Sequence, residues 1–206
     1  MDKPIIIIIS GPSASGKTHL IEWLYQRYTQ YVSVISADNY YFKQDHIPMH
    51  ERLNVNYDHP NAIDWKLLAA HLEAIAHNQA IQSPRYCFVK CTRLDTSITI
   101  QPKPIILLDG LLSLAMPNIR KLAHLSLYMD TPLDICLSRR IKRDVAVRGR
   151  TTEQVLNQYL TKTRPMYFDY ILPSRQYADL IIPSTDHIEK VSILLQQYLV
   201  GYIHQE

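Results

Sequence analysis

Residues 11–18 read Gly-Pro-Ser-Ala-Ser-Gly-Lys-Thr, and this stretch decides the fold. It matches the whole P-loop pattern GxxxxGK[ST]. The run Ile5–Ile9 directly before it is typical of a strand buried on both faces, and a helical pattern follows over residues 16–28. At average residue frequencies, a chance match in a chain of this length is on the order of one in a hundred. The flanking strand and helix argue further against chance, so the sequence predicts a site for a nucleoside triphosphate.

The residues of this loop predict how the phosphates are held. Backbone N–H groups of such a loop turn inward as an anion nest, and the helix that follows adds its positive N-terminus. Lys17 is expected to reach the β- and γ-phosphates, and the Thr18 hydroxyl is expected to coordinate Mg²⁺. The predicted phosphate-binding residues are Gly11, Ser13, Ala14, Ser15, Gly16, Lys17 and Thr18.

The rest of the chain alternates strand-like and helix-like patterns. Apolar runs at 31–36, 104–108, 125–129 and 180–182 predict further strands, and residues 86–89 with 97–100 predict a small β-hairpin. Helical patterns cover 64–78, 132 to beyond 143, 152–163 and 188–202. Buried strands that alternate with helices predict an α/β fold with a doubly wound, mostly parallel sheet flanked by helices.

Composition argues against several classes of protein. A net charge of +3 is too small to indicate a nucleic-acid partner. The longest aliphatic run, Ile5–Ile9, is too short to span a bilayer and lacks the flanks of a signal peptide. The three cysteines have no spacing typical of a disulfide framework. We therefore expect a cytoplasmic protein whose partners include neither a membrane nor a nucleic acid.

Acidic residues stand at the carboxyl ends of two predicted strands, where sheets of this kind bind their ligands. Asp38 could orient an acceptor hydroxyl, take its proton or bind Mg²⁺ through water. Asp109 invites the same interpretations, and either residue could instead be a turn or N-cap aspartate. In the polar loop 56–64, Asp58 suits a pair of vicinal hydroxyls, and Asp64 is interpreted as the N-cap of the next helix.

A dense basic cluster follows the strand at 125–129. It consists of Arg139, Arg140, Lys142, Arg143, Arg148 and Arg150. Helical spacing brings several of these side chains to one side, where like charges repel unless an anion lies among them. One interpretation is a mobile lid over residues 139–150 that closes on the phosphates and stabilises charge during phosphoryl transfer. The alternative is a solvated charged face with Asp134 and Asp144 as partners.

Together these stretches resemble the uridine kinase (uridine–cytidine kinase) family. The similarity runs from about residue 5 to residue 183, and its most specific part is DTPLDICLSRRIKRDVAVRGR at 130–150. The other matching stretches are GPSASGKT at 11–18, ADNYY at 37–41, NYDHPNAID at 56–64, DG at 109–110, and the run from Gln158-Tyr159 through Arg164-Pro165 to the Tyr177-Ala178-Asp179 region. The sequence contains no linker, repeat or low-complexity segment, so we expect a single P-loop kinase domain over residues 1–206, and the resemblance implies that the hairpin lies over the nucleoside site.

The resemblance also implies roles for the matched positions. The catalytic residues would be Asp38, as the base toward the 5′-hydroxyl, with Lys17, Arg143 and Arg148. Mg²⁺ would be bound by Thr18, Asp38 and Asp109. The nucleoside would be held by Asp58, Tyr86, Phe88, Cys91, Arg140, Arg150 and Gln158. Members of this family are commonly tetramers, so a homo-oligomer is implied as well.

Two positions depart from the family pattern. Where the family commonly has a histidine that bonds the pyrimidine edge, this chain has Cys91, a weak donor and a weaker acceptor. A site that loses a polar partner for the base is expected to lose discrimination. The usual Glu-Gly pair is Asp109-Gly110, which keeps the charge but shortens the side chain by one methylene.

The sequence thus predicts ATP-dependent phosphorylation of the 5′-hydroxyl of uridine, cytidine or both, as in pyrimidine salvage, with Mg²⁺ as cofactor. One alternative is a related P-loop kinase with another small acceptor, such as a phosphoribulokinase or a pantothenate kinase. A second alternative is a nucleotide-binding regulatory protein without kinase activity, for which Cys91 is the only support. The choice of base and the choice between ATP and GTP stay open at this stage.

Overall fold

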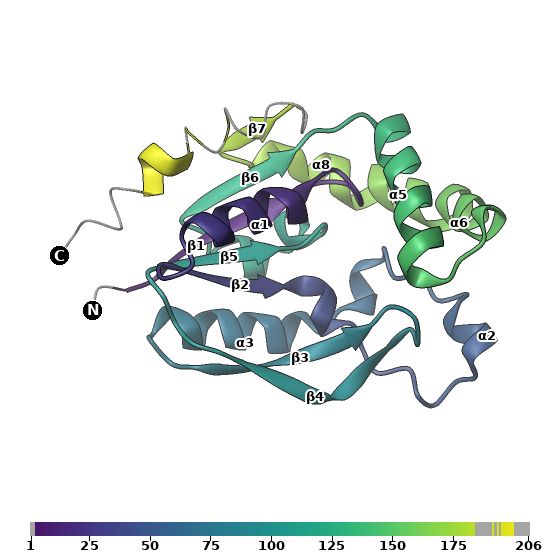
Figure 1. Ribbon diagram of the computed structural model, residues 1–206, viewed down its shortest axis with the longest axis horizontal. Helices are drawn as coiled ribbons and strands as arrows, with labels where there is room; N and C mark the ends of the chain where they lie inside the picture. Colours follow the sequence, from purple (N-terminus) through teal and green to yellow (C-terminus); the bar gives the residue numbers. More distant parts are fainter. Residues whose placement is uncertain (1–2, 184–190, 192, 194, 200–206) are drawn as a thin grey trace.

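A five-stranded parallel sheet forms the centre of the computed structural model, which describes residues 3–183, 191, 193 and 195–199 (Figure 1). Its strands are β1 (Ile5–Ser10), β2 (Val32–Ser36), β5 (Ile105–Asp109), β6 (Leu125–Met129) and β7 (Leu180–Ile182). They lie in the order β2-β5-β1-β6-β7. Every pairing in this sheet is parallel, so the predicted α/β fold is confirmed.

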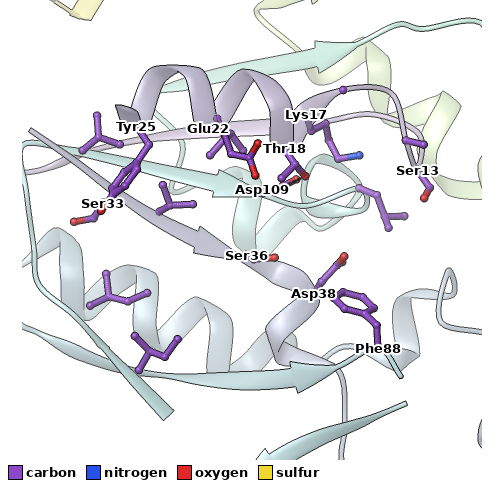
Figure 2. Close-up of a pocket in the computed structure, with 18 of the residues that line it drawn as sticks. Ser13, Lys17, Thr18, Glu22, Tyr25, Ser33, Ser36, Asp38, Phe88 and Asp109 are labelled. Atoms are coloured by element: carbon purple, nitrogen blue, oxygen red, sulfur yellow. Dashed lines mark hydrogen bonds between the residues drawn. The ribbon is translucent and has the colours of Figure 1, made fainter. Parts of the chain in front are cut away.

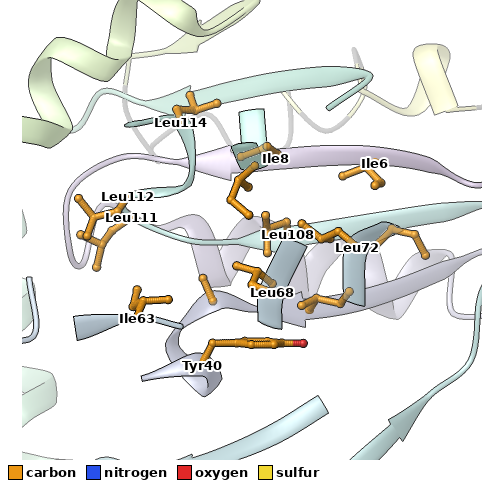
Figure 3. Close-up of a cluster of buried hydrophobic side chains, with 14 of the residues drawn as sticks. Ile6, Ile8, Tyr40, Ile63, Leu68, Leu72, Leu108, Leu111, Leu112 and Leu114 are labelled. Atoms are coloured by element: carbon orange, nitrogen blue, oxygen red, sulfur yellow. The ribbon is translucent and has the colours of Figure 1, made fainter. Parts of the chain in front are cut away.

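Helices cover both faces of the sheet, because successive side chains of a strand point to opposite faces. In β1, Ile6 and Ile8 pack toward α3 (Trp65–Ala76), in the cluster drawn in Figure 3. The side chains on the other face, such as Ile7, pack against α1 (Lys17–Arg27). All six residues of β1 are buried, as its unbroken apolar run predicts.

The carboxyl ends of the strands all point toward the region where α5 (Leu133–Arg148) and α6 (Thr152–Gln158) stand (Figure 1). β1 pairs with β5 on one side and β6 on the other, and the chain continues from β1 into the P-loop. The P-loop therefore occupies the crevice where strand order reverses, which is the usual ligand site of such sheets.

The hairpin forms, but its predicted bounds are wrong. Its arms are β3 (Ile81–Cys87) and β4 (Thr92–Ile100), so residues 88–91 make the turn, whereas the sequence pattern indicated arms at 86–89 and 97–100. The ribbon is two-stranded, and most of β4 is exposed. Its polar residues can therefore face solvent, and because they interrupt the apolar pattern, apolar runs alone did not give the correct bounds of the strand.

The segment after α6 is also more irregular than the predicted helix over 152–163. Helical backbone continues, but residues 159–163 and 167–171 widen into π-helical turns. The remaining short helices are α2 (Met49–Arg52), α4 (Pro117–Arg120), α7 (Arg164–Met166) and α8 (Leu172–Ser174). The predicted helix over 188–202 lies partly outside the described residues; within it, 191, 193 and 195–199 are helical.

In the part of the chain that the structure describes, no helix has the length and apolar character needed to cross a membrane.

Candidate active site

The P-loop is held in shape by two glycines with positive φ angles. Gly11 has φ 131° and Gly16 has φ 102°, backbone angles that residues other than glycine rarely adopt. A Cβ atom on Gly11 would also lie 2.5 Å from the carbonyl oxygen of Met129 on β6. The loop therefore packs directly against β6, and α1 begins immediately after Gly16.

Lys17 and Thr18 lie at the start of α1 and face the carboxyl end of β5. The Lys17 ammonium is buried and donates to the carbonyl oxygens of Gly11 at 3.0 Å and Pro12 at 2.9 Å. The Thr18 hydroxyl donates to Asp109 Oδ2 at 2.8 Å. Burial lowers the pKa of Lys17, and the nearby carboxylates of Asp109 and Asp38 oppose that shift.

Asp38 lies in a short 3-10 turn, Ala37–Tyr40, at the carboxyl end of β2. Burial raises the pKa of its carboxyl group, the charge of Asp109 raises it further, and the guanidinium of Arg148 opposes the shift. Asp38 is half-buried, and a carboxyl with a raised pKa beside cations is typical of groups that exchange protons during catalysis.

A cavity of about 940 Å³ opens in front of the P-loop and brings these side chains together. Figure 2 shows Lys17, Thr18 and Asp109 on one side of it, with Asp38 and Phe88 on the opposite side. Of the predicted phosphate-binding residues, Ser13, Ala14 and Gly16 also line this cavity. Gly11 instead offers its carbonyl oxygen to Lys17. The Ser15 side chain is buried, and the Ser15 N–H donates to Pro12 O at 3.1 Å.

A second, smaller cavity of about 70 Å³ adjoins the first and holds the residues predicted to bind the nucleoside. Asp58 is buried there and accepts from the Thr163 hydroxyl at 2.6 Å. Arg140 Nη1 lies 3.6 Å from Asp58 Oδ2, and Arg140 Nη2 donates to Gln158 Oε1 at 3.1 Å. A carboxylate, a guanidinium and an amide thus converge on one polar end of the cavity.

Aromatic rings form a further wall of the small cavity. Tyr86 contacts Tyr41 and Phe88, with ring centroids 5.0 Å and 5.2 Å apart. The Tyr86 N–H donates to Asn39 Oδ1 at 3.2 Å, which ties the hairpin to the turn that carries Asp38. Such a wall suits a flat heteroaromatic base.

Cys91 and Arg150 meet at the same cavity. Arg150 Nη2 donates to Cys91 Sγ at 2.9 Å, and the Cys91 thiol donates to the Phe88 carbonyl at 3.3 Å. Cys91 is buried and has φ 49° in the hairpin turn. The polar groups that this corner presents are therefore mainly donors, led by the Arg150 guanidinium.

The arginines of α5 do not form the solvated face that was the alternative interpretation. Arg140 is buried, Arg143 and Arg148 line both cavities, and Asp144 is buried between them. Arg148 lies over the ring of Phe88, with Cζ 4.0 Å from the ring centroid. The exposed residue Asp134 lies in the first turn of the same helix.

The two cavities share part of their walls, and this shared part lies at the centre of the site. The side chains that line both are Ser13, Asp38, Phe88, Leu111, Arg143 and Arg148. A phosphoryl group that passes from one cavity to the other would therefore pass Asp38 and the two arginines.

Sequence reasoning missed several residues that shape the site. Thr163 and Asn39 contact predicted site residues, but neither carries a charge that draws attention in the sequence. Tyr41 and Tyr57 line the small cavity. Both lie inside stretches that carry the family resemblance, and this was the signal by which they could have been found. Asp144 was considered only as a surface ion-pair partner.

Comparison with known proteins agrees with this geometry. A model of the Phosphoribulokinase / Uridine kinase family matches residues 6–190. This chain belongs to that family. The uridine kinase of Vibrio vulnificus strain YJ016 is 46% identical over 184 residues, which cover 87% of this chain and 86% of that protein. The uridine kinase of Shewanella frigidimarina is 45% identical over 184 residues, covering 87% of each chain.

Solved structures of more distant kinases have the same fold. The Rhodobacter spheroides phosphoribulokinase matches with a TM-score of 0.65 and 22% identity, over 86% of this chain and 68% of that one. The D-glycerate 3-kinase of Cryptococcus neoformans matches with a TM-score of 0.61 and 17% identity, over 84% and 81% of the two chains. The predicted P-loop kinase fold and the predicted family are both confirmed.

Proposed function

We propose that this member of the family transfers the γ-phosphoryl group of ATP to the 5′-hydroxyl of uridine, cytidine or both. The observation that carries the proposal is the wall shared by the two cavities, in which Asp38 stands between the P-loop and the polar end that holds Asp58. The large cavity has room for a triphosphate, and the side chains that line the small one are of the kinds that bind a ribose and a flat base. The names of the curated relatives support the same acceptor class.

In this mechanism Asp38 acts as the base. Its carboxylate would orient the 5′-hydroxyl and take its proton late in the transfer, when the oxygen has become acidic. Phosphoryl transfer requires little covalent help from the protein, so most of the rate enhancement comes from positioning and charge. Lys17, Arg143 and Arg148 would supply the positive charge around the transferred group and exclude water.

The ribose would lie at the polar end of the small cavity. Asp58 can accept from vicinal hydroxyls, and the Arg140 guanidinium and the Gln158 amide can donate to the ribose oxygens. Tyr86 and Phe88 offer faces on which a pyrimidine can pack. Arg150 and Cys91 would meet the polar edge of the base.

The donor set near the P-loop fits Mg²⁺. The oxygens of Thr18 and Asp109 already lie within 2.8 Å of each other, and Mg²⁺ prefers oxygen ligands that include substrate phosphates. Thr18, Asp109 and Asp38 would hold the ion, directly or through water, and the bound ion would neutralise charge on the phosphates. The donor nucleotide is proposed to be ATP.

A substrate panel tests the proposal. ATP consumption by the purified protein is measured with uridine, cytidine, purine nucleosides, ribulose 5-phosphate and pantothenate as acceptors. Turnover with uridine or cytidine alone is the expected result. Turnover confined to ribulose 5-phosphate or pantothenate would assign another acceptor. ATP binding without turnover of any acceptor would favour a regulatory protein.

We also propose a homotetramer in the cytoplasm, on the family resemblance. Light scattering coupled to gel filtration should give four times the chain mass. A monomeric mass at micromolar concentration would contradict the proposed assembly, and the proposed reaction would stand independently of it.

A further inference from the structure

A single buried carboxylate lies among the arginines of α5. Asp144 is 2% exposed. Its Oδ1 accepts from Arg143 Nε at 2.8 Å and lies 3.4 Å from Arg148 Nη1. Its Oδ2 lies 3.6 Å from Arg140 Nε. One negative charge therefore contacts three guanidinium groups that the proposed mechanism assigns to two different substrates.

The backbone of the same residue ends the helix. The Asp144 carbonyl oxygen accepts from the N–H groups of Gly149 and Arg150, and Gly149 closes the helix with φ 66°. Asp144 thus fixes the helix end as well as the side chains around it.

Each arginine that contacts Asp144 also contacts a wall of a cavity. Arg140 reaches Asp58 and Gln158 at the polar end of the small cavity. Arg148 lies over Phe88, and Arg143 Nη2 lies 3.5 Å from the Ser13 hydroxyl in the P-loop. A shift of Arg140 on nucleoside binding would therefore be transmitted through one carboxylate to the two arginines nearest the phosphates.

The electrostatics of the cluster depend on this carboxylate. Burial lowers the pKa of the Arg148 guanidinium, the charge of Arg143 lowers it further, and Asp144 opposes the shift. Without the negative charge, three buried or half-buried cations would repel one another, and the most mobile would turn toward solvent.

We propose that Asp144 is a positioning residue that couples occupancy of the nucleoside cavity to the placement of Arg143 and Arg148 at the phosphates. This inference rests on the proposed nucleoside kinase activity. Asp144 lines the small cavity, but both of its carboxylate oxygens lie against arginines, so the proposal assigns it no contact with substrate.

The test compares Asp144→Asn with Asp134→Asn, which makes the same chemical change at an exposed position of the same helix. Steady-state rates are measured with uridine and ATP. Because small displacements of positioned groups cost about 100-fold in rate, we expect Asp144→Asn to lower kcat by at least about tenfold. The ATP KM should stay within about threefold, since the P-loop is intact. Asp134→Asn should match the wild type.

A double-mutant cycle separates positioning from general loss of structure. Arg148→Ala should cost much less kcat in the Asp144→Asn background than in the wild type, because Asp144 acts through Arg148. Purely multiplicative losses would overturn the proposal, as would a folded Asp144→Asn variant with wild-type kcat.

Asp144→Glu covers the case in which the asparagine variant does not fold. It keeps the charge but moves the carboxylate by one methylene, so kcat should fall by at least about threefold, because catalytic groups tolerate little displacement. If the asparagine variant does not fold, a folded glutamate variant with wild-type kcat would overturn the proposal.

A wild-type protein that does not phosphorylate uridine but uses another acceptor would refute the proposed substrate. The same variants would then be measured with that acceptor.

Discussion

Asp38 combines its proposed role as the base with a cost in stability. Burial and the neighbouring Asp109 both raise the pKa of its carboxyl group above 3.8. A group whose pKa is raised in the folded state binds its proton more tightly when folded, so ionisation above that pKa destabilises the fold. Asp38→Asn should therefore lower kcat by about 100-fold or more, leave ATP binding in place and raise the midpoint of thermal unfolding at pH 7.

The pH dependence checks the sign of this argument. The gain in stability of Asp38→Asn over the wild type should shrink as the pH is lowered through the raised pKa toward 3.8, where the wild-type carboxyl is also neutral. Asp95→Asn serves as the control, at an exposed position on β4 where the carboxylate accepts from Lys43 Nζ. It should leave kcat unchanged and shift the midpoint only slightly, because exposed ion pairs contribute little to stability. Near-wild-type kcat in Asp38→Asn would remove Asp38 from the role of base.

Cys91 gives a second prediction at the residue scale. Its sulfur is held by Arg150 and its backbone φ is 49°, a region that histidine tolerates better than most residues. Cys91→His should add a hydrogen bond to the base edge, worth about 1 kcal/mol or roughly fivefold in nucleoside KM. The ratio of uridine to cytidine turnover should change as well. Initial rates with both nucleosides measure the effect.

The matched control for this variant is Cys87→Ser. Cys87 ends β3 and lines neither cavity, so its substitution should leave both KM values unchanged. Unchanged nucleoside KM and base ratio in Cys91→His would show that the base lies elsewhere.

The role of a single residue could be predicted from the sequence where its partners are close to it in the chain. Asp64 is the N-cap of α3, and its side chain accepts from Leu67 N at 3.0 Å, as the sequence indicates. Thr163 could not be found in this way, because its partner Asp58 is 105 positions away in the chain. Burial of Asp144 was equally invisible, since the helical spacing shows which arginines are near it but not which face of α5 is covered.

At the scale of elements, Arg93 of β4 joins the hairpin β3–β4 to the turn that carries Asp38, in addition to the bond between Tyr86 and Asn39. Arg93 Nε donates to Tyr41 O at 2.8 Å, and Arg93 Nη2 donates to Tyr40 O at 2.6 Å. Arg93→Ala leaves these two carbonyls without this partner and loosens the contact between the ribbon and the turn. Hydrogen bonds to charged groups are worth about 1.5–3 kcal/mol, so the nucleoside KM should rise by about tenfold or more while the ATP KM changes little.

Arg85→Ala supplies the comparison within the same hairpin. Arg85 is exposed on β3, and its loss should leave the nucleoside KM within a factor of two. An equal rise of KM in both variants, or no rise in Arg93→Ala, would contradict the anchoring role of Arg93.

The elements differ in how well the sequence predicted them, for a physical reason. β1 and β5 are buried on both faces and therefore appear as unbroken apolar runs. β4 has solvent on much of its surface, so its pattern is weak and its start was placed five residues late. The first π-helical turn after α6 contains Thr163, whose partner Asp58 is far away in the sequence, so this contact could not be predicted from the local pattern.

For the whole molecule, the alternation of strands and helices was sufficient to predict the layers but not the order of strands. Many orders satisfy the same alternation, and the observed β2-β5-β1-β6-β7 order depends on which faces pack best. This order places the carboxyl ends of β1, β2 and β5 side by side. Lys17, Asp38 and Asp109 thereby meet although they are far apart in the sequence.

That arrangement leads to a prediction about the two cavities acting as one site. Because they share a wall, a single molecule with adenosine and uridine joined 5′ to 5′ through a phosphate chain should occupy both. Linking two ligands makes the second binding event intramolecular and raises affinity by about 100-fold or more when the linker spans the distance. Isothermal titration calorimetry should therefore give a Kd at least about 100-fold below that of uridine.

Two comparisons identify which contacts produce that gain. The same phosphate chain on adenosine without uridine should bind more weakly, and the difference should largely disappear in Asp58→Asn, because that variant weakens only the polar end of the small cavity. A linked compound that binds no better than the adenosine polyphosphate alone would mean that the two cavities cannot be filled together. In that case the acceptor would have to approach the P-loop from another direction, and Asp38 would lose its place between the substrates.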